Sequence, residues 1–237
     1  PQPLLDAAMG YVDAAVRQAR EAADAPEAGF DITVESEIPL GAGLGSSAAV
    51  VVAGIDAATR ALGEPLDRRE IADRAYRAEY EVQDGQASRA DTFCSAMGGA
   101  VRVEGDDCTT LSTPTLPFVV GFDGGAGDTG KLVADVRALR DRYDFAADTV
   151  AAIGDIVSTG EELLREADPN ADPSDALIEE LGDLMNINHG LLSALGVSSR
   201  SLDTMVWAAR EAGAEGAKLT GAGGGGCIVA LDRTDET

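Results

Sequence analysis

Apolar residues recur at helical spacing from Leu4 to Ala23, and Pro26 and Gly29 then interrupt the pattern. Residues 31–38 (DITVESEI) alternate between apolar and polar side chains, which predicts a half-buried strand. A glycine-rich stretch follows, and a mostly apolar segment from Ser47 to Leu62 predicts a helix. The first quarter of the chain therefore reads as helix, strand, loop and helix.

The next segment opens with a capping box, because Asp67 and Glu70 stand three residues apart before a helical pattern that runs to about Val82. The loop DGQASRAD leads to a short helix or turn, then to the strand AVRVE at residues 100–104. Threonine, serine and proline cluster between Gly105 and Phe118, which suggests a domain boundary. We expect one domain over residues 1–112 and a second over 113–237.

Helices dominate the rest of the chain, between an early and a late strand. Strands are predicted at residues 118–122, 217–220 (AKLT) and 227–231 (CIVAL). Helices are predicted at Thr129–Arg142, Asp148–Ala167, Ser174–Leu195 and Leu202–Ala212. Because strands do not alternate regularly with helices, the fold class is α+β.

The charge of the chain is strongly negative. Its 237 residues carry 42 Asp and Glu against 18 Lys and Arg, a net charge of −24, and Lys131 and Lys218 are the only lysines. The acids alternate with Ala and Leu along the predicted helices, as on a solvated surface. Such an excess predicts a protein that works in concentrated salt, where self-repulsion is screened within about 3 Å at 1 M. It also argues against nucleic acid or an anionic membrane as a partner.

The cysteines and the hydropathy suggest a cytoplasmic protein. Cys94, Cys108 and Cys227 are odd in number and lack metal-ligand spacing, so reduced thiols are expected. There is no signal-peptide pattern and no apolar run of about 18 residues that would predict a membrane span.

The first glycine-rich loop, PLGAGLGSS at residues 39–47, lies between the predicted strand and helix. Its glycines let an anion approach the backbone, and the helix that follows offers free N–H groups and a positive dipole end. The two serine hydroxyls can cap the helix, bind a phosphate oxygen or ligate Mg²⁺. A tight turn alone would not need three glycines and two serines, so we predict phosphate binding.

The second loop, KLTGAGGGGC at residues 218–227, joins two apolar strands. So many glycines are costly to order, which indicates that a ligand needs the bare backbone. Together the two loops resemble the ATP-binding motifs of the GHMP kinase family. The form of the second loop, and LMNINHGLLSALGVSSRSLD upstream of it, resemble the members that phosphorylate mevalonate.

This resemblance implies the two-domain GHMP kinase fold, with an N-terminal part like domain 2 of ribosomal protein S5 and a ferredoxin-like C-terminal part. It implies ATP-dependent phosphorylation of mevalonate, with Mg²⁺ as cofactor. A homodimer is expected by analogy. The implied ATP contacts are Gly41, Ala42, Gly43, Leu44, Gly45, Ser46, Ser47, Thr220, Gly221, Gly223 and Gly224.

The catalytic residues follow from the same resemblance. Ser88-Arg-Ala-Asp91 before Gly98-Gly99 resembles the family's Ser-x-x-Asp stretch, so Asp91 is expected to accept the proton of the substrate hydroxyl and Ser88 to contact the substrate. Asp91 could also cap the following turn. The implied Mg²⁺ ligands are Ser47 and Glu79, with Glu81 as the alternative, because Asp84 is one residue more than the family pattern has.

Two further residues are considered. Asp128-Thr129 resembles a family segment whose Thr lies near mevalonate, although Thr129 could instead cap a helix. His189 is the only histidine, and the resemblance gives it no role.

The chain departs from the family at its start, where nothing resembles the family's Pro-Gly…Gly-Glu-His motif. We therefore expect this chain alone not to be fully active. The alternatives are another GHMP kinase, acting on phosphomevalonate or homoserine, a diphosphomevalonate decarboxylase-like enzyme, or a nucleotide-binding module without catalysis.

Overall fold

The computed structural model describes residues 2–38, 43–85, 87–125 and 127–233. They form two compact units, one of residues 1–40 and 45–111 and the other of residues 41–44 and 112–237. None of the helices in the described ranges is long and apolar enough to cross a membrane.

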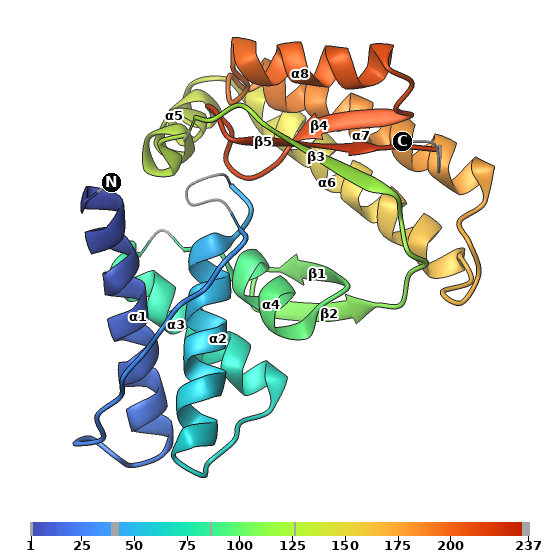
Figure 1. The fold of residues 1–237 in the computed structure, drawn as a ribbon. Coiled ribbons are helices and arrows are strands. Elements are labelled where there is room, and N and C mark those ends of the chain that lie inside the picture. Colours follow the sequence, from blue (N-terminus) through green and yellow to red (C-terminus); the bar gives the residue numbers. More distant parts are fainter. Residues whose placement is uncertain (1, 39–42, 86, 126, 234–237) are drawn as a thin grey trace. The chain divides into compact units, whose positions relative to one another are not determined.

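The first unit consists mainly of helices that contact one another (Figure 1). Its elements are α1 (Gln2–Ala22), α2 (Ser46–Ala61), α3 (Arg68–Val82), α4 (Arg89–Met97) and the hairpin of β1 (Ala100–Glu104) and β2 (Asp107–Leu111). Ala14 and Ala15 are buried against Val51 and Ile55, and a Cβ on Gly54 would lie 3.0 Å from the Cβ of Ala15. These small residues let α1 and α2 lie close together.

Residues 31–38 are not a strand, so this prediction was wrong. No β-ladder includes them in the part of the chain that the structure describes. They run alongside α1 and α2 and form one wall of a groove of about 580 Å³, in which Ile32 and Val34 stay about half exposed. The alternating pattern was real, but a strand also needs a hydrogen-bonded neighbour.

The second unit is an antiparallel sheet with helices on both faces (Figure 1). The strands run in the order β3 (Phe118–Phe122), β5 (Cys227–Leu231) and β4 (Gly216–Leu219). On one face α8 (Arg200–Glu211) packs its Leu202 and Val206 on the sheet. On the other, α6 (Asp144–Glu166) and α7 (Asp175–Ala194) cover Leu231, and α5 (Thr129–Arg142) precedes α6. The α+β fold class is confirmed.

Most predicted elements are present, with one strand missed. The cap of α3 is as predicted, since the Asp67 side chain accepts from the N–H of Glu70 at 2.9 Å, a contact worth about 1 kcal/mol. Strand β2 lies within residues 105–118, where the sequence predicts a domain boundary. Helix α6 begins at Asp144, four residues before its predicted start at Asp148.

Candidate active site

Helix α2 begins without a side-chain cap. Its N-cap is Gly45, in the left-handed region at φ 68°, and among the described residues no side chain makes a capping hydrogen bond to it. The capping role considered for the serines is therefore not seen. Ser47 instead donates its hydroxyl to Oε1 of Glu79, at 2.6 Å. A first turn without a side-chain cap can offer its N–H groups to an anion.

Glu79 is a buried carboxyl group in this unit. Its exposed fraction is 2%, and besides Ser47 its Oε1 accepts from Nε2 of Gln83 at 3.4 Å. Burial raises the pKa of Glu79, the Ser47 hydrogen bond opposes that shift, and the charge of Asp91 adds to it. A carboxylate so placed favours a cation, which would relieve both its burial and its repulsion from Asp91.

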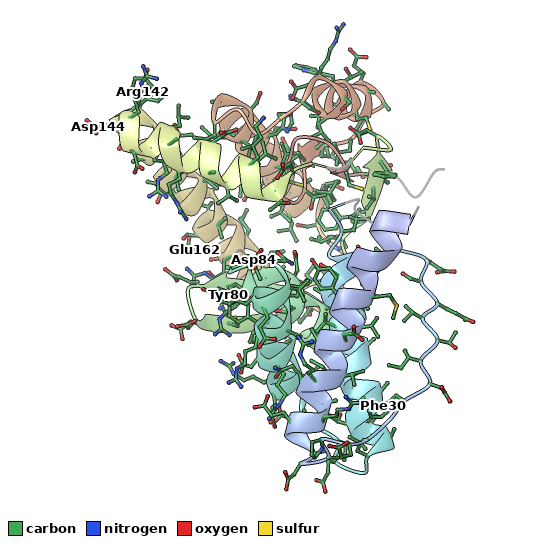
Figure 2. All side chains as sticks on the ribbon, turned by 90° about the vertical axis from the view of Figure 1, so that its left-hand side faces the viewer. Phe30, Tyr80, Asp84, Arg142, Asp144 and Glu162 are labelled. Carbon is green, nitrogen blue, oxygen red and sulfur yellow. The ribbon has the colours of Figure 1, made fainter. Side chains whose placement is uncertain are left out.

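Glu79 and Glu81, the two candidate metal ligands, have different surroundings on α3. Asp84, labelled in Figure 2, follows the end of α3. Its φ is 49°, and that of Gly85 is 84°. Asp84 thus lies in the turn after the helix, so it does not affect the positions of Glu79 and Glu81 within α3. Glu81 is largely exposed and pairs with Arg17 at 3.2 Å, whereas Glu79 meets Ser47.

Asp91 lies in the first turn of α4 and is not the N-cap of that helix. The cap is Ser88, whose hydroxyl oxygen accepts from the N–H of Ala90 at 3.2 Å, so the capping alternative for Asp91 is wrong. A Cβ on Gly45 would lie 3.6 Å from the Cβ of Asp91, which places this carboxyl beside the start of α2. The side chain is open to solvent at one side, yet the protein atoms packed around it raise its pKa by desolvation. Asp91 thus lies beside both Glu79 and Gly45 of the first loop. Among the described contacts its carboxyl group has no hydrogen bond.

The second glycine-rich loop leaves β4 and returns on β5 in a conformation open only to glycine at several positions. Gly223 and Gly224 have φ 89° and 75°, and a Cβ on Gly223 would overlap the carbonyl oxygen of Val197. Gly43 of the first loop belongs to the same unit, and a Cβ on it would lie 3.6 Å from the carbonyl oxygen of Thr220. Gly41 and Ala42 lie outside the described residues.

Thr129 is the first residue of α5 and does not cap it. The cap is Asp128, whose Oδ1 accepts from the N–H of Lys131 at 3.0 Å. The capping alternative for Thr129 was therefore wrong.

Helix α7 binds the free edge of β4 through polar side chains that the sequence analysis did not interpret. Asn186 donates to the carbonyl oxygen of Glu215 at 2.9 Å and accepts from the N–H of Ala217 at 3.1 Å. One turn on, Nδ1 of His189 accepts from the N–H of Leu219 at 3.3 Å. The residues recur at i and i+3 on one face of α7, a signal that could have been read as a polar stripe facing an edge strand.

His189 is therefore a structural residue in this unit. Because Nδ1 accepts a hydrogen bond, Nε2 carries the proton and donates to Oδ1 of Asp203 at 3.2 Å. Burial lowers the pKa of His189, although Asp203 acts in the opposite direction. A neutral imidazole is what this pair of hydrogen bonds requires.

Two known protein families match parts of this chain. The GHMP kinases N-terminal domain matches residues 10–99, which contain the first loop, Glu79 and Asp91. The GHMP kinases C-terminal family matches residues 174–237, which contain α7 and the second loop. The chain belongs to the GHMP kinase family.

Known members of the family are similar over most of this GHMP kinase chain. The mevalonate kinase of Thermococcus gammatolerans is 45% identical over 225 residues, which are 94% of the chain. The crystal structure of the Methanococcus jannaschii mevalonate kinase superposes with a TM-score of 0.79 at 28% identity and covers 94% of the chain. That of L. major mevalonate kinase in complex with R-mevalonate gives 0.73 at 26% identity and covers 96%.

This GHMP kinase chain is shorter than those proteins. It spans 66% of the length of the Thermococcus relative, 67% of the Methanococcus chain and 69% of the L. major chain.

The residues described here fit a divalent cation only in part. Within the described ranges no group of three or more His, Cys, Asp or Glu side chains could hold a metal ion. Mg²⁺ in kinases, however, is bound through one or two protein oxygens together with substrate phosphates and water. Ser47 and Glu79 supply two such oxygens, 2.6 Å apart.

Proposed function

We propose that the full-length protein transfers the γ-phosphate of ATP to the hydroxyl group of mevalonate, giving phosphomevalonate for isoprenoid biosynthesis. The observation that carries this proposal is the placement of Ser47, Glu79 and Asp91 beside the start of α2, in a chain 45% identical to a mevalonate kinase. The co-substrate is ATP, as the kinase family implies.

Each element of the proposed site has a defined task. The first loop, with Gly43 to Ser47, and the N–H groups at the start of α2 bind phosphate oxygens, as does the second loop from Thr220 to Gly224. Asp91 accepts the proton of the attacking hydroxyl as the oxygen–phosphorus bond forms and the bond to ADP breaks. Its raised pKa makes it a better base than an ordinary aspartate.

Ser47 and Glu79 are the proposed ligands of Mg²⁺. Their oxygens and the low exposure of Glu79 match a hard cation that keeps water and phosphate in its remaining positions. Mg²⁺ supplies charge neutralisation on the transferring phosphoryl group. Ser47 would turn its hydroxyl proton away from Glu79 when both oxygens coordinate.

Mevalonate contacts are assigned to Ser88 and Thr129. The Ser88 oxygen accepts from Ala90, which leaves its own proton free to donate to a substrate oxygen. Thr129 stands at the N-terminal end of α5, where a carboxylate such as that of mevalonate is favoured.

We also propose the domain division at residues 112 and 113, a cytoplasmic location and a homodimer. Sedimentation of the full-length protein at several concentrations tests the dimer. A species with the mass of one chain at all concentrations would exclude it.

The function is tested by offering the full-length protein Mg·ATP with mevalonate, phosphomevalonate and homoserine in separate reactions at high KCl. Turnover with mevalonate alone is the expected result. Turnover with another alcohol would keep the family and change the substrate. ATP binding without turnover on any of the three would indicate a nucleotide-binding module.

A further inference from the structure

The second glycine-rich loop has an ordered backbone although its composition favours disorder. Gly221, Gly223, Gly224, Gly225 and Gly226 all have positive φ. A segment of this kind loses much conformational entropy when it is fixed, so it needs contacts that hold it. One such contact is the hydrogen bond from the N–H of Gly224 to the carbonyl oxygen of Val197, at 2.8 Å.

The other end of the loop is held by the carboxyl group of Asp123, just after β3. Oδ1 of Asp123 accepts from the N–H of Gly226 at 2.9 Å, and the N–H of Asp123 donates to the carbonyl oxygen of Gly226 at 3.0 Å. Both backbone groups of Gly226 are therefore bound to a single residue. The pairing continues the β3–β5 ladder one residue into the loop.

The same carboxyl group ties this end of the loop to two other segments. Oδ1 also accepts from the N–H of Gly125 at 2.7 Å, which closes the turn after β3. Oδ2 accepts from the hydroxyl of Ser201 in the first turn of α8, at 2.5 Å. These bonds, that of Ser201 first, lower the pKa of Asp123, so the group is ionised at neutral pH.

We propose that Asp123 is a positioning residue that holds the second glycine-rich loop in the conformation that binds the phosphates of ATP. The inference rests on the proposed function. Asp123 acts through the loop, because a carboxylate repels a phosphate and its oxygens are already occupied by Gly226, Gly125 and Ser201. It was not among the residues that the sequence analysis singled out.

The variants separate the hydrogen bonds from the charge. Asp123→Ala removes all three side-chain bonds. Asp123→Asn keeps an acceptor for the two glycine N–H groups and can donate its Nδ2 to the oxygen of Ser201. Ser201→Ala removes the hydrogen bond to Oδ2 of Asp123 and leaves the hydrogen bond between Gly226 and Oδ1 in place. Asp168→Ala is the matched control, because Oδ1 of Asp168 closes a similar turn on the N–H of Asn170 at 2.9 Å, in the connection between α6 and α7.

Two readouts on the full-length protein test the proposal. The first is hydrogen exchange of the peptide that contains residues 220–227, which requires no assumption about function. The second is ATP affinity, measured as the Kd of a fluorescent ATP analogue and as KM for ATP beside KM for mevalonate. For Asp123→Ala we expect faster exchange in this peptide and an ATP Kd raised about tenfold, with KM for mevalonate unchanged within about twofold.

Ser201→Ala should raise the ATP Kd about threefold, while Asp123→Asn should restore most of the affinity and Asp168→Ala should match the wild type. Unchanged exchange in Asp123→Ala, or faster exchange with unchanged ATP affinity, would overturn the proposal. If Asp123→Ala does not fold, Ser201→Ala decides, and an unchanged Kd in that variant would overturn it. Absence of mevalonate turnover in the wild type would reject the proposed function, whereas the exchange and the ATP Kd would still test Asp123.

Discussion

Replacing Asn186 with alanine removes the amide group through which α7 binds the free edge of β4. The carbonyl oxygen of Glu215 and the N–H of Ala217 then lose their partners in a partly buried place. An unpaired backbone group costs about 1–3 kcal/mol when water cannot replace the partner. Ala217 is fully buried, but Asn186 and Glu215 are only half-buried. We therefore take the lower part of that range for each group and expect a loss of about 2–3 kcal/mol.

That loss corresponds to a fall in Tm of roughly 5–10 °C for a protein of this size. Urea unfolding followed by circular dichroism measures it directly. Asp183→Ala, at an exposed position of α7, is the control and should stay within about 0.5 kcal/mol of the wild type. Asn186→Asp should be at least as unstable as Asn186→Ala, because a carboxylate can accept from Ala217 but repels the oxygen of Glu215. An Asn186→Ala variant as stable as the control would refute the assignment of these two hydrogen bonds.

Four other changes have expected outcomes. Glu79→Gln should raise the Mg²⁺ concentration for half-maximal activity by roughly tenfold or more, and an unchanged requirement would remove Glu79 from the metal site. Gly182→Ala should destabilise by about 1–3 kcal/mol in urea unfolding, because its Cβ would lie 2.7 Å from the carbonyl carbon of Glu215, whereas Gly190→Ala on the same helix has open space and should not destabilise. The folded-state pKa of His189 lies below its unfolded value, so its contribution to stability is complete above about pH 6.5 and is lost as the pH falls. His189→Gln should therefore flatten the fall in unfolding free energy between pH 7.5 and about 5.5. Equal slopes of unfolding free energy against pH in the wild type and the variant would contradict this. Activity should rise with KCl because screening relieves the repulsion between a chain of charge −24 and its anionic substrates, and a rate that falls steadily from low to multimolar KCl would contradict it.

Local signals in the sequence were enough to predict most of the helices. Helix α5 occupies the predicted residues Thr129–Arg142, and the Asp67–Glu70 pair marked the start of α3. Such signals act within one or two turns, so a single sequence contains them. The two glycine-rich loops could also be predicted from the sequence, because a run of glycines between regular elements is seldom needed for structure alone.

Two elements were predicted wrongly: residues 31–38, which are not a strand, and β2, which was not predicted. Residues 31–38 alternate like a strand, but pairing depends on a neighbour that local pattern cannot supply. Strand β2 was overlooked although Gly105-Asp106 is a two-residue hairpin loop between Glu104 and Asp107. This local signal predicts the hairpin, and Thr109 and Thr110 are residues of β2 rather than of a linker.

The functional residues also fall into two groups, those that the sequence identified and those that only tertiary contacts reveal. Ser47, Glu79 and Asp91 were named through the resemblance, and their proximity in the first unit depends on α2, α3 and α4 packing together. Asp123 and Asn186 act across 103 and 31 residues of chain, from β3 to the second loop and from α7 to β4. Contacts at such separations follow from tertiary packing, and no spacing rule within one element identifies them.

The central claim is that this protein phosphorylates mevalonate with Asp91 as the base. The most direct measurement is the transfer of labelled γ-phosphate from ATP to mevalonate by the full-length wild type and by Asp91→Asn, with ATP binding measured in both. The account predicts labelled phosphomevalonate from the wild type, at least a hundredfold less from Asp91→Asn, and equal ATP binding. Comparable product from Asp91→Asn, or no labelled phosphomevalonate from a wild type that binds ATP, would contradict it.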